Sequence, residues 1–356
     1  MTAVRLFLLS ALLFISSSRG DTIHLLAGSG RLGDGSPAKR ALLESPFGLV
    51  EAPSGDVVFV EMTGHRVRAI HPDGVLFTIA GTGKEGFSGD NGPANQAEFK
   101  GMHALAVAKD GTLYIADTWN NRVRKIDPKT GRIETVVGTG ESGFSGDGGP
   151  AMSAKFGGIY SISLTPDGAT MVLADLDNRR VRAVDLRTNI VTTVAGNGRK
   201  GVPRDGAVAT ESPLVDPRAV AVDGSGNIYI LERSGHALRV VDRSGKVRTV
   251  AGTGKAGASG DGGPAKVATL NGPKDLTIDR DGGVLIADTE NHLIRKYSPS
   301  AGTIIRVAGV GTKGTKGIGG APEAAELNQP HGVTVDRKGA ILVSDSSNHR
   351  IVKIER

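Results

Sequence analysis

Short hydrophobic runs, rich in β-branched residues and separated by polar turns, follow one another along the whole chain. In one stretch, Asp110-Gly111 and Pro128–Gly131 supply turn-forming residues between such runs. No segment after residue 20 keeps a helical period. The runs of this stretch predict four short antiparallel strands. They cover His103–Val107, Leu113–Ala116, Arg122–Ile126 and Ile133–Val137.

This four-strand unit recurs six times. The second strand of each unit ends in an acidic residue, and these acids are spaced by 56 to 58 residues. They are Glu61, Asp117, Asp175, Glu232, Asp288 and Asp345. Four-stranded units repeated at a fixed period are typical of β-propellers, which usually have four to eight blades.

The two ends of the chain indicate how the ring closes. The last repeat begins at Leu327 and stops at Arg356 after three strands, whereas Thr22–Gly28 matches the fourth strand of other copies, such as Phe77–Gly81. Closure removes unpaired strand edges. We therefore predict an all-β fold, a single six-bladed propeller of four-stranded antiparallel blades over residues 21–356, with the N-terminal strand completing the last blade.

The first twenty residues have the layout of a signal peptide. Arg5 precedes an apolar stretch from Leu6 to Ile15, and Ser16–Ser18 follow as small residues for a peptidase. The apolar stretch is shorter than the 20 or so residues that span a bilayer, and no other segment is a candidate span. We expect a signal peptide over residues 1–20 and a secreted or periplasmic protein without a membrane span.

Composition narrows the chemistry further. The chain has no cysteine, which excludes disulfides, zinc-thiolate sites and cysteine nucleophiles. The net charge is +6, and Arg5 and Arg19 of that count lie in the predicted signal peptide. The remaining charge is spread evenly, unlike the clustered basic surface of nucleic-acid binders. We expect no nucleic-acid partner.

The element that follows each acid resembles the NHL-repeat family. An element of the type Asp-x-x-Asn-x-Arg-Val-Arg is found at Asp117–Arg124 and Asp175–Arg182 and, in part, at Asp288–Arg295 and Asp345–Val352. The resemblance covers residues 22–356 and implies a propeller. It does not imply one function, because family members include RNA binders, adhesion modules and enzymes. Glycine-rich loops such as Gly146–Ala151 are similar to those of exported bacterial NHL proteins and teneurin-type propellers.

Most acids, arginines and histidines of the repeats have structural explanations. One Asp per loop is too few for calcium, which takes six to eight oxygen ligands, so we expect the loop acids to bind backbone N–H groups of their own turns. The recurring Asp and Arg of the NHL element should pair as part of the architecture. We expect His65, His236, His292 and His349 to be ordinary surface residues.

One equivalent position differs in nearly every copy. It lies at the start of the first strand, where the channel mouth and the long loops of a propeller meet. Because ligands bind in concavities with a few convergent polar groups, we predict a ligand site there, with drift at a water-facing position as the alternative. The six residues, called the mouth ring below, are Phe47, His103, Tyr160, Arg218, Lys274 and His331. We predict no catalytic residue, metal or cofactor.

These observations favour an exported monomeric scaffold that binds a protein, glycan or small molecule, and lean away from an enzyme. The alternative is a metal-dependent lyase or hydrolase with its site in the channel. The amidating-lyase branch of NHL-like propellers is similar in placing histidines, an arginine and a tyrosine there, which His103, His331, Arg218 and Tyr160 match in part. Gluconolactonase-like propellers use acidic and amide metal ligands, which the mouth ring lacks.

Overall fold

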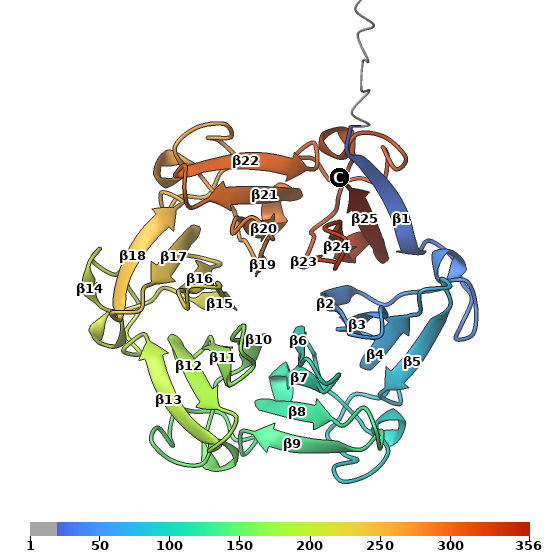
Figure 1. Cartoon of the computed structure of the whole chain (residues 1–356), viewed down its shortest axis with the longest axis horizontal. Coiled ribbons are helices and arrows are strands. Elements are labelled where there is room, and N and C mark those ends of the chain that lie inside the picture. The colour runs from blue at the N-terminus through green and yellow to red at the C-terminus, as the bar shows by residue number, and fades with distance from the viewer. Residues whose placement is uncertain (1–19) are drawn as a thin grey trace, which may run out of the picture.

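A computed structural model describes residues 20–356 and confirms the six-bladed propeller. Six antiparallel sheets surround a central axis, with the first strand of each blade innermost (Figure 1). The first three blades are β2 (Pro46–Glu51), β3 (Val57–Glu61), β4 (Arg66–Ile70) and β5 (Leu76–Ala80); β6 (Ala104–Val107), β7 (Leu113–Asp117), β8 (Arg122–Ile126) and β9 (Ile133–Val137); and β10 (Ile159–Leu164), β11 (Thr170–Asp175), β12 (Arg180–Asp185) and β13 (Ile190–Ala195).

The fourth blade has one strand more than predicted. The two-residue β14 pairs with the outer edge of β18, because the loop before this blade runs back along it. The last three blades are β15 (Pro217–Val222), β16 (Ile228–Glu232), β17 (Ala237–Val241), β18 (Lys246–Ala251) and β14 (Ala207–Val208); β19 (Asp275–Ile278), β20 (Val284–Asp288), β21 (Leu293–Ser298) and β22 (Thr303–Ala308); and β23 (Gly332–Val335), β24 (Ile341–Asp345), β25 (Arg350–Glu355) and β1 (Thr22–Gly28).

Helical structure within residues 20–356 is limited to three-residue 3₁₀ turns. No helix in this range is long and apolar enough to cross a membrane. Residues 1–19 of the predicted signal peptide lie outside the described residues. The turns are Ala38–Arg40, Ala94–Gln96, Thr118–Asn120, Ala151–Ser153, Ala209–Glu211, Ala265–Val267, Thr289–Asn291, Pro322–Ala324 and Ser346–Asn348.

The N-terminal strand closes the ring as predicted. β1 pairs antiparallel with β25, from Thr22 opposite Glu355 to Gly28 opposite Arg350, so that the first and last strands of the chain share one sheet (Figure 1). Ile23 is fully buried, within a hydrophobic cluster formed by the fifth and sixth blades. The closure therefore rests on both backbone pairing and side-chain burial.

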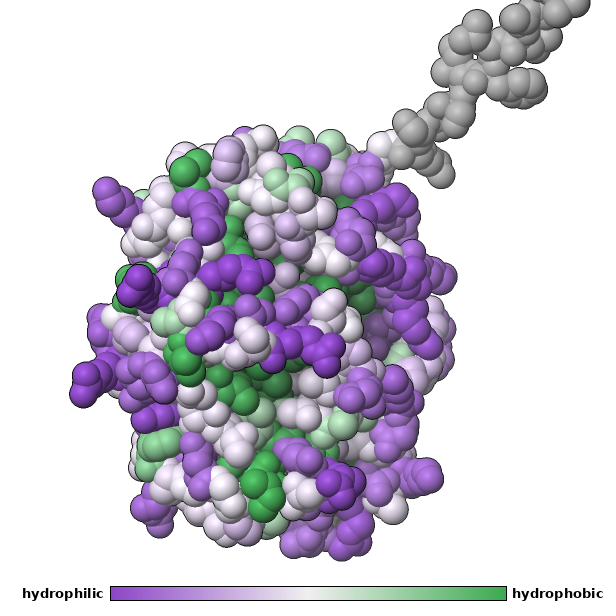
Figure 2. Space-filling view, turned by 60° about the vertical axis from the view of Figure 1, so that its left-hand side comes forward, coloured by the Kyte–Doolittle hydropathy of each residue, from purple (hydrophilic) through white to green (hydrophobic). Residues whose placement is uncertain are grey.

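The hydrophobic core lies between neighbouring blades. One cluster joins Val60 and Val67 of the first blade to Leu105 and Ile115 of the second, around Phe99 from the connecting loop. Figure 2 shows one side of the molecule, where hydrophobic residues are visible in recesses between projecting hydrophilic side chains. A bulky apolar residue equivalent to Phe99 is buried in every blade. The set is Leu43, Phe99, Phe156, Leu214, Leu270 and Leu327.

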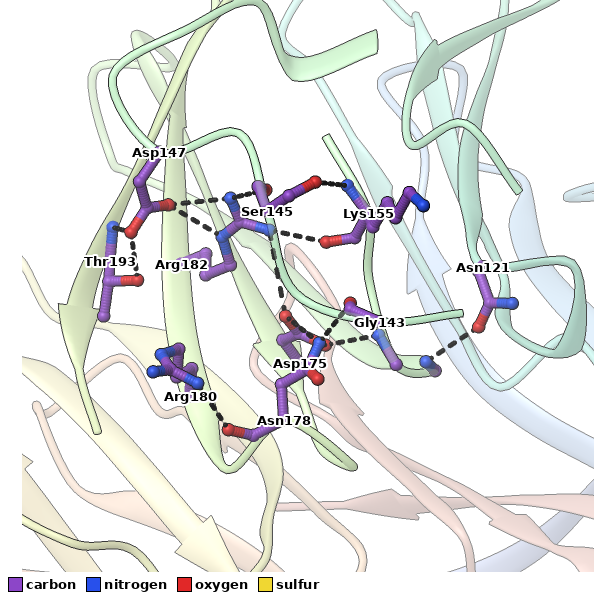
Figure 3. Close-up of polar contacts among 12 residues, drawn as sticks. Asn121, Gly143, Ser145, Asp147, Lys155, Asp175, Asn178, Arg180, Arg182 and Thr193 are labelled. Carbon is purple, nitrogen blue, oxygen red and sulfur yellow. Dashed lines mark hydrogen bonds and ion pairs between the residues drawn. The ribbon is translucent and has the colours of Figure 1, made fainter. Parts of the chain in front are cut away.

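The loop acids have a different partner from the one expected. Instead of binding their own turns, four of them reach a buried arginine on the third strand of the blade, and Asp205 accepts from Thr249 and Lys266. Asp147 Oδ1 accepts a hydrogen bond of 2.7 Å from Arg182, whose guanidinium also donates to the carbonyl oxygens of Ser145 and Lys155, both at 2.9 Å (Figure 3). The same acid accepts from Thr193 on the fourth strand. Sequence separation hid this partner, since Asp147 and Arg182 lie 35 residues apart.

The acid that ends the second strand faces the same guanidinium, as the repeat predicted. Asp175 Oδ2 lies 3.9 Å from Arg182, and the carboxylate also accepts from the Gly157 amide and the Asn178 side chain. Burial raises the pKa of Asp175 to about 6, against the opposing effect of these hydrogen bonds and of Arg182. Each such arginine thus joins the loop, the second strand and the third strand of one blade.

The sixth blade replaces this arrangement as a unit. Ile318 stands where the other loops carry an acid, and Val352 takes the strand position of the buried arginine; both join one apolar cluster. Arg350, two residues earlier, then donates to Asp345 at 2.7 Å and to the carbonyl oxygen of Glu326 at 2.9 Å. The loop acid and its arginine are therefore lost together, while the strand-end acid keeps a guanidinium partner.

Several turn histidines join neighbouring blades instead of simply facing solvent. His236 and His292 have positive φ values of 45° and 56°. Their Nδ1 atoms accept hydrogen bonds from backbone amides at the start of the next blade, Gly272 and Gln329, both at 3.1 Å. His349 Nδ1 likewise accepts a hydrogen bond of 3.2 Å from the Ser45 amide, across the closure of the ring.

Candidate ligand site at the channel mouth

The mouth ring occupies one equivalent backbone position in all six blades. In three blades its residue sits in a β-bulge at the start of the inner strand, as at Phe47, Tyr160 and Arg218. In the others its residue, such as His103, directly precedes that strand. Bulges redirect side chains and are frequent beside functional sites. This position therefore turns its side chain toward the axis of the propeller.

One half of the ring is a run of aromatic contacts. Phe47 stacks on His331 with ring centroids 4.1 Å apart and meets His103 edge-on at 5.1 Å. His103 meets Tyr160 at 4.7 Å on its other side. Trp119, from the turn after β7, contacts His103 at 5.9 Å and is 46% exposed. The aromatic half thus continues outward to an accessible indole.

The other half carries positive charge. The Arg218 guanidinium lies 4.6 Å above the Tyr160 ring and is 4% exposed as a residue. Lys274 Nζ donates to Glu290 at 2.7 Å and lies 3.1 Å from Nε2 of His331. Within residues 20–356, Arg218 and Lys274 are the ring neighbours between which no hydrogen bond or aromatic contact is found. The run of such contacts is therefore interrupted between the two cations.

Both ring histidines are neutral acceptors. The Nδ1 atoms of His103 and His331 lie 2.7 Å from the carbonyl oxygens of Gly101 and Gln329. A carbonyl only accepts, so each Nδ1 carries the proton and each Nε2 presents a lone pair. Burial lowers both pKa values well below the usual value, and the nearby Arg218 charge lowers them further.

Beneath the ring lies a narrow cavity of about 230 Å³. It is lined by the inner strands from Gly48 to Val50 and their equivalents, and none of the six ring residues is among its lining. Asp275 carries the one carboxylate among these lining residues. Its Oδ2 accepts a hydrogen bond of 2.9 Å from the Val333 amide. Burial raises the pKa of Asp275 to about 7. The ring thus closes the channel at the end that carries the long loops.

Sequence analysis placed the six ring residues together, and the structure brings them into contact. It missed three neighbours, Trp119, Glu290 and Asp275. The NHL motif carries the first two on turns, and Asp275 stands at a position where the other blades have small residues. The lone tryptophan in the chain was an available signal. Among residues 20–356, no three His, Asp or Glu side chains form a group that could hold a metal ion.

Comparison with known proteins supports the repeat assignment. The NHL repeat model matches residues 99–126, 270–297 and 327–354. These segments run from the buried loop residue to the third strand of the second, fifth and sixth blades. The chain is an NHL-repeat β-propeller. Its repeats also match relatives that carry NHL repeats in larger proteins.

Two such relatives show how far the likeness extends. The propeller is 24% identical over 331 residues to NHL repeat-containing protein 2 of Gallus gallus, covering 84% of this chain and 44% of that protein. It is 26% identical over 290 residues to Teneurin-4 of Mus musculus, covering 74% of this chain and 10% of that protein. The NHL propeller therefore spans less than half the length of these relatives.

A solved structure shares the fold. An auxiliary nutrient binding protein from Bacteroides thetaiotaomicron superposes with a TM-score of 0.67 and 17% identity, over 94% of this chain and 76% of that one. At this identity the likeness concerns the fold.

Proposed function

We propose that this NHL propeller is an exported binding scaffold whose ligand rests on the mouth ring. The observation that supports the proposal is the contrast between repetition elsewhere and variety here. Loop acids and buried arginines recur from blade to blade, whereas ring neighbours such as Phe47, Tyr160 and Lys274 differ and still form one contiguous group. A site that binds one ligand needs a few different chemical groups that converge on that ligand. The name of the Bacteroides protein, a nutrient binder of the same fold, agrees with this role.

Trp119 offers a direct test, since it is the only tryptophan and contacts His103. We expect the correct ligand to change tryptophan fluorescence when neutral oligosaccharides, acidic oligosaccharides and peptides are titrated into the protein. Tyr160→Ala should weaken that binding, because it removes the support of both His103 and Arg218. Lys129→Ala, in the exposed turn at the opposite end of the strands, is the matched control. Binding that survives every ring substitution contradicts the proposal.

Export is tested separately. If residues 1–20 are a signal peptide, protein recovered from the periplasm or medium begins after this segment. Mass spectrometry of the secreted and retained fractions measures the N-terminus. An intact Met1 on protein that stays in the cytoplasm contradicts export and leaves the ligand site untouched.

A further inference from the structure

Arg218 has far fewer partners than the other buried arginines. Arg124, Arg182 and Arg295 each donate to a loop carboxylate and to two backbone carbonyls. Arg218 donates one side-chain hydrogen bond, 3.3 Å to the carbonyl oxygen of Tyr160, and within residues 20–356 no carboxylate lies within salt-bridge distance. A guanidinium has five N–H donors. Most of its hydrogen-bonding capacity is therefore unused.

The nearby acids are already engaged or only partly charged. Asp216 binds Arg233 at 3.0 Å, and Glu290 binds Lys274 at 2.7 Å. Asp275 is fully enclosed, and burial raises its pKa to about 7. Asp177 is exposed, and its charge acts on Arg233 and Arg179. Among residues 20–356, no carboxylate is therefore paired with Arg218 itself.

Resting on the proposed function, we propose that the mouth ring recognises a carboxylate-bearing sugar, with Arg218 and Lys274 holding the carboxylate. The planar fork of Arg218 fits a carboxylate in two-point contact. A single guanidinium without an acidic partner suits a monoanion better than a phosphate dianion. Within the described residues, no hydrogen bond or aromatic contact joins the two cations.

The rest of the mouth suits the sugar itself. His103 presents its Nε2 lone pair, and within the described residues no donor occupies it, so it can accept from a sugar hydroxyl. The exposed Trp119, which contacts His103, offers an apolar face against which a pyranose ring can pack. A uronic acid residue combines a carboxylate, hydroxyl groups and an apolar ring face, which match these three features of the mouth.

The experiment compares trigalacturonate with its methyl ester, in which each carboxylate becomes an uncharged ester that carries an added methyl group. Calorimetry on the full chain should show binding of the acid and binding at least about tenfold weaker for the ester, because the ester cannot form hydrogen bonds between two charged groups. Arg218→Gln and Lys274→Gln should each weaken acid binding by a similar factor. Lys129→Gln is the control, and thermal melts check that each variant folds.

The outcomes separate this inference from the proposed function. Equal binding of acid and ester overturns carboxylate recognition and leaves a ring that binds sugars. Tighter binding of inorganic phosphate than of trigalacturonate overturns the choice of carboxylate. If neither trisaccharide binds while a neutral ligand still changes Trp119 fluorescence, the inference fails and the scaffold remains.

Discussion

Arg182 and Arg218 are both buried guanidinium groups, yet their surroundings differ. Arg182 is held by Asp147, by two carbonyl oxygens and by the nearby Asp175. Arg218 lies on the Tyr160 ring with one side-chain hydrogen bond. The first arrangement recurs at equivalent positions of four blades. The second occurs once, so packing does not demand it.

The sixth blade shows what packing does demand. There the loop acid and the arginine are both replaced by apolar residues, Ile318 and Val352. A buried charge is costly when its partner is absent, whereas an apolar pair of similar shape is tolerated. The peripheral network therefore behaves as a coupled unit. In the mouth ring, by contrast, the residue at the equivalent position changes from blade to blade.

The largest effect on the periphery should come from removing β1. Deleting residues 1–28 leaves the outer edge of β25 unpaired and exposes the core that Ile23 covers. Burial of Ile23 alone contributes about 1.5–3 kcal/mol, so we expect a loss of more than about 3 kcal/mol in the free energy of unfolding. Urea denaturation measures it, with a chain lacking only residues 1–19 as control. A melting temperature within a degree or two of that control contradicts closure by β1.

A matched pair of arginine substitutions sharpens the contrast between periphery and mouth. Arg182→Met leaves Asp147 and the buried Asp175 without their cation, and we expect it to lower the free energy of unfolding by about 3–5 kcal/mol. Arg218→Met removes a charge that has no paired acid, and it should change the free energy of unfolding by less than about 1 kcal/mol. Chemical denaturation of both variants gives the two values.

A third variant tests the coupling seen in the sixth blade. The double substitution Asp147→Ile/Arg182→Val copies Ile318 and Val352, and Arg180 lies at the position from which Arg350 reaches its acid. The double variant should be more stable than Arg182→Val alone. Equal stabilities of Arg182→Met and Arg218→Met, or no gain in the double variant, would show that repetition is a poor guide to structural role here.

Sequence reasoning recovered the features that depend on periodicity. The spacing of the strand-end acids predicted the blades, and the likeness of Thr22–Gly28 to Phe77–Gly81 predicted the closure. It misassigned the loop acids such as Asp147, because their arginine partners are brought near only by folding of the blade. It missed β14 because a two-residue strand has no pattern of its own. It located the mouth ring but not the order of contacts within it, which depends on rotamers.

The last expected effect concerns the pH dependence of stability at the centre. Burial raises the pKa of Asp275 from 3.8 to about 7, so between these values the folded protein holds a proton that the unfolded chain releases. Stability from this group is therefore fully present below about pH 4 and is lost as the pH rises through about 7. Asp275→Asn keeps an oxygen for the Val333 amide but does not titrate.

We expect the free energy of unfolding of Asp275→Asn, relative to the unmodified chain, to rise between pH 4.5 and 7.5, by at most about 1.4 kcal/mol per pH unit for one proton. Peripheral acids such as Asp175, with a pKa of about 6, are present in both proteins and cancel. Urea denaturation at several pH values measures the difference. A difference independent of pH means that Asp275 is ionised throughout. The acid then compensates the charge of Arg218, and the mouth has no spare positive charge for a carboxylate.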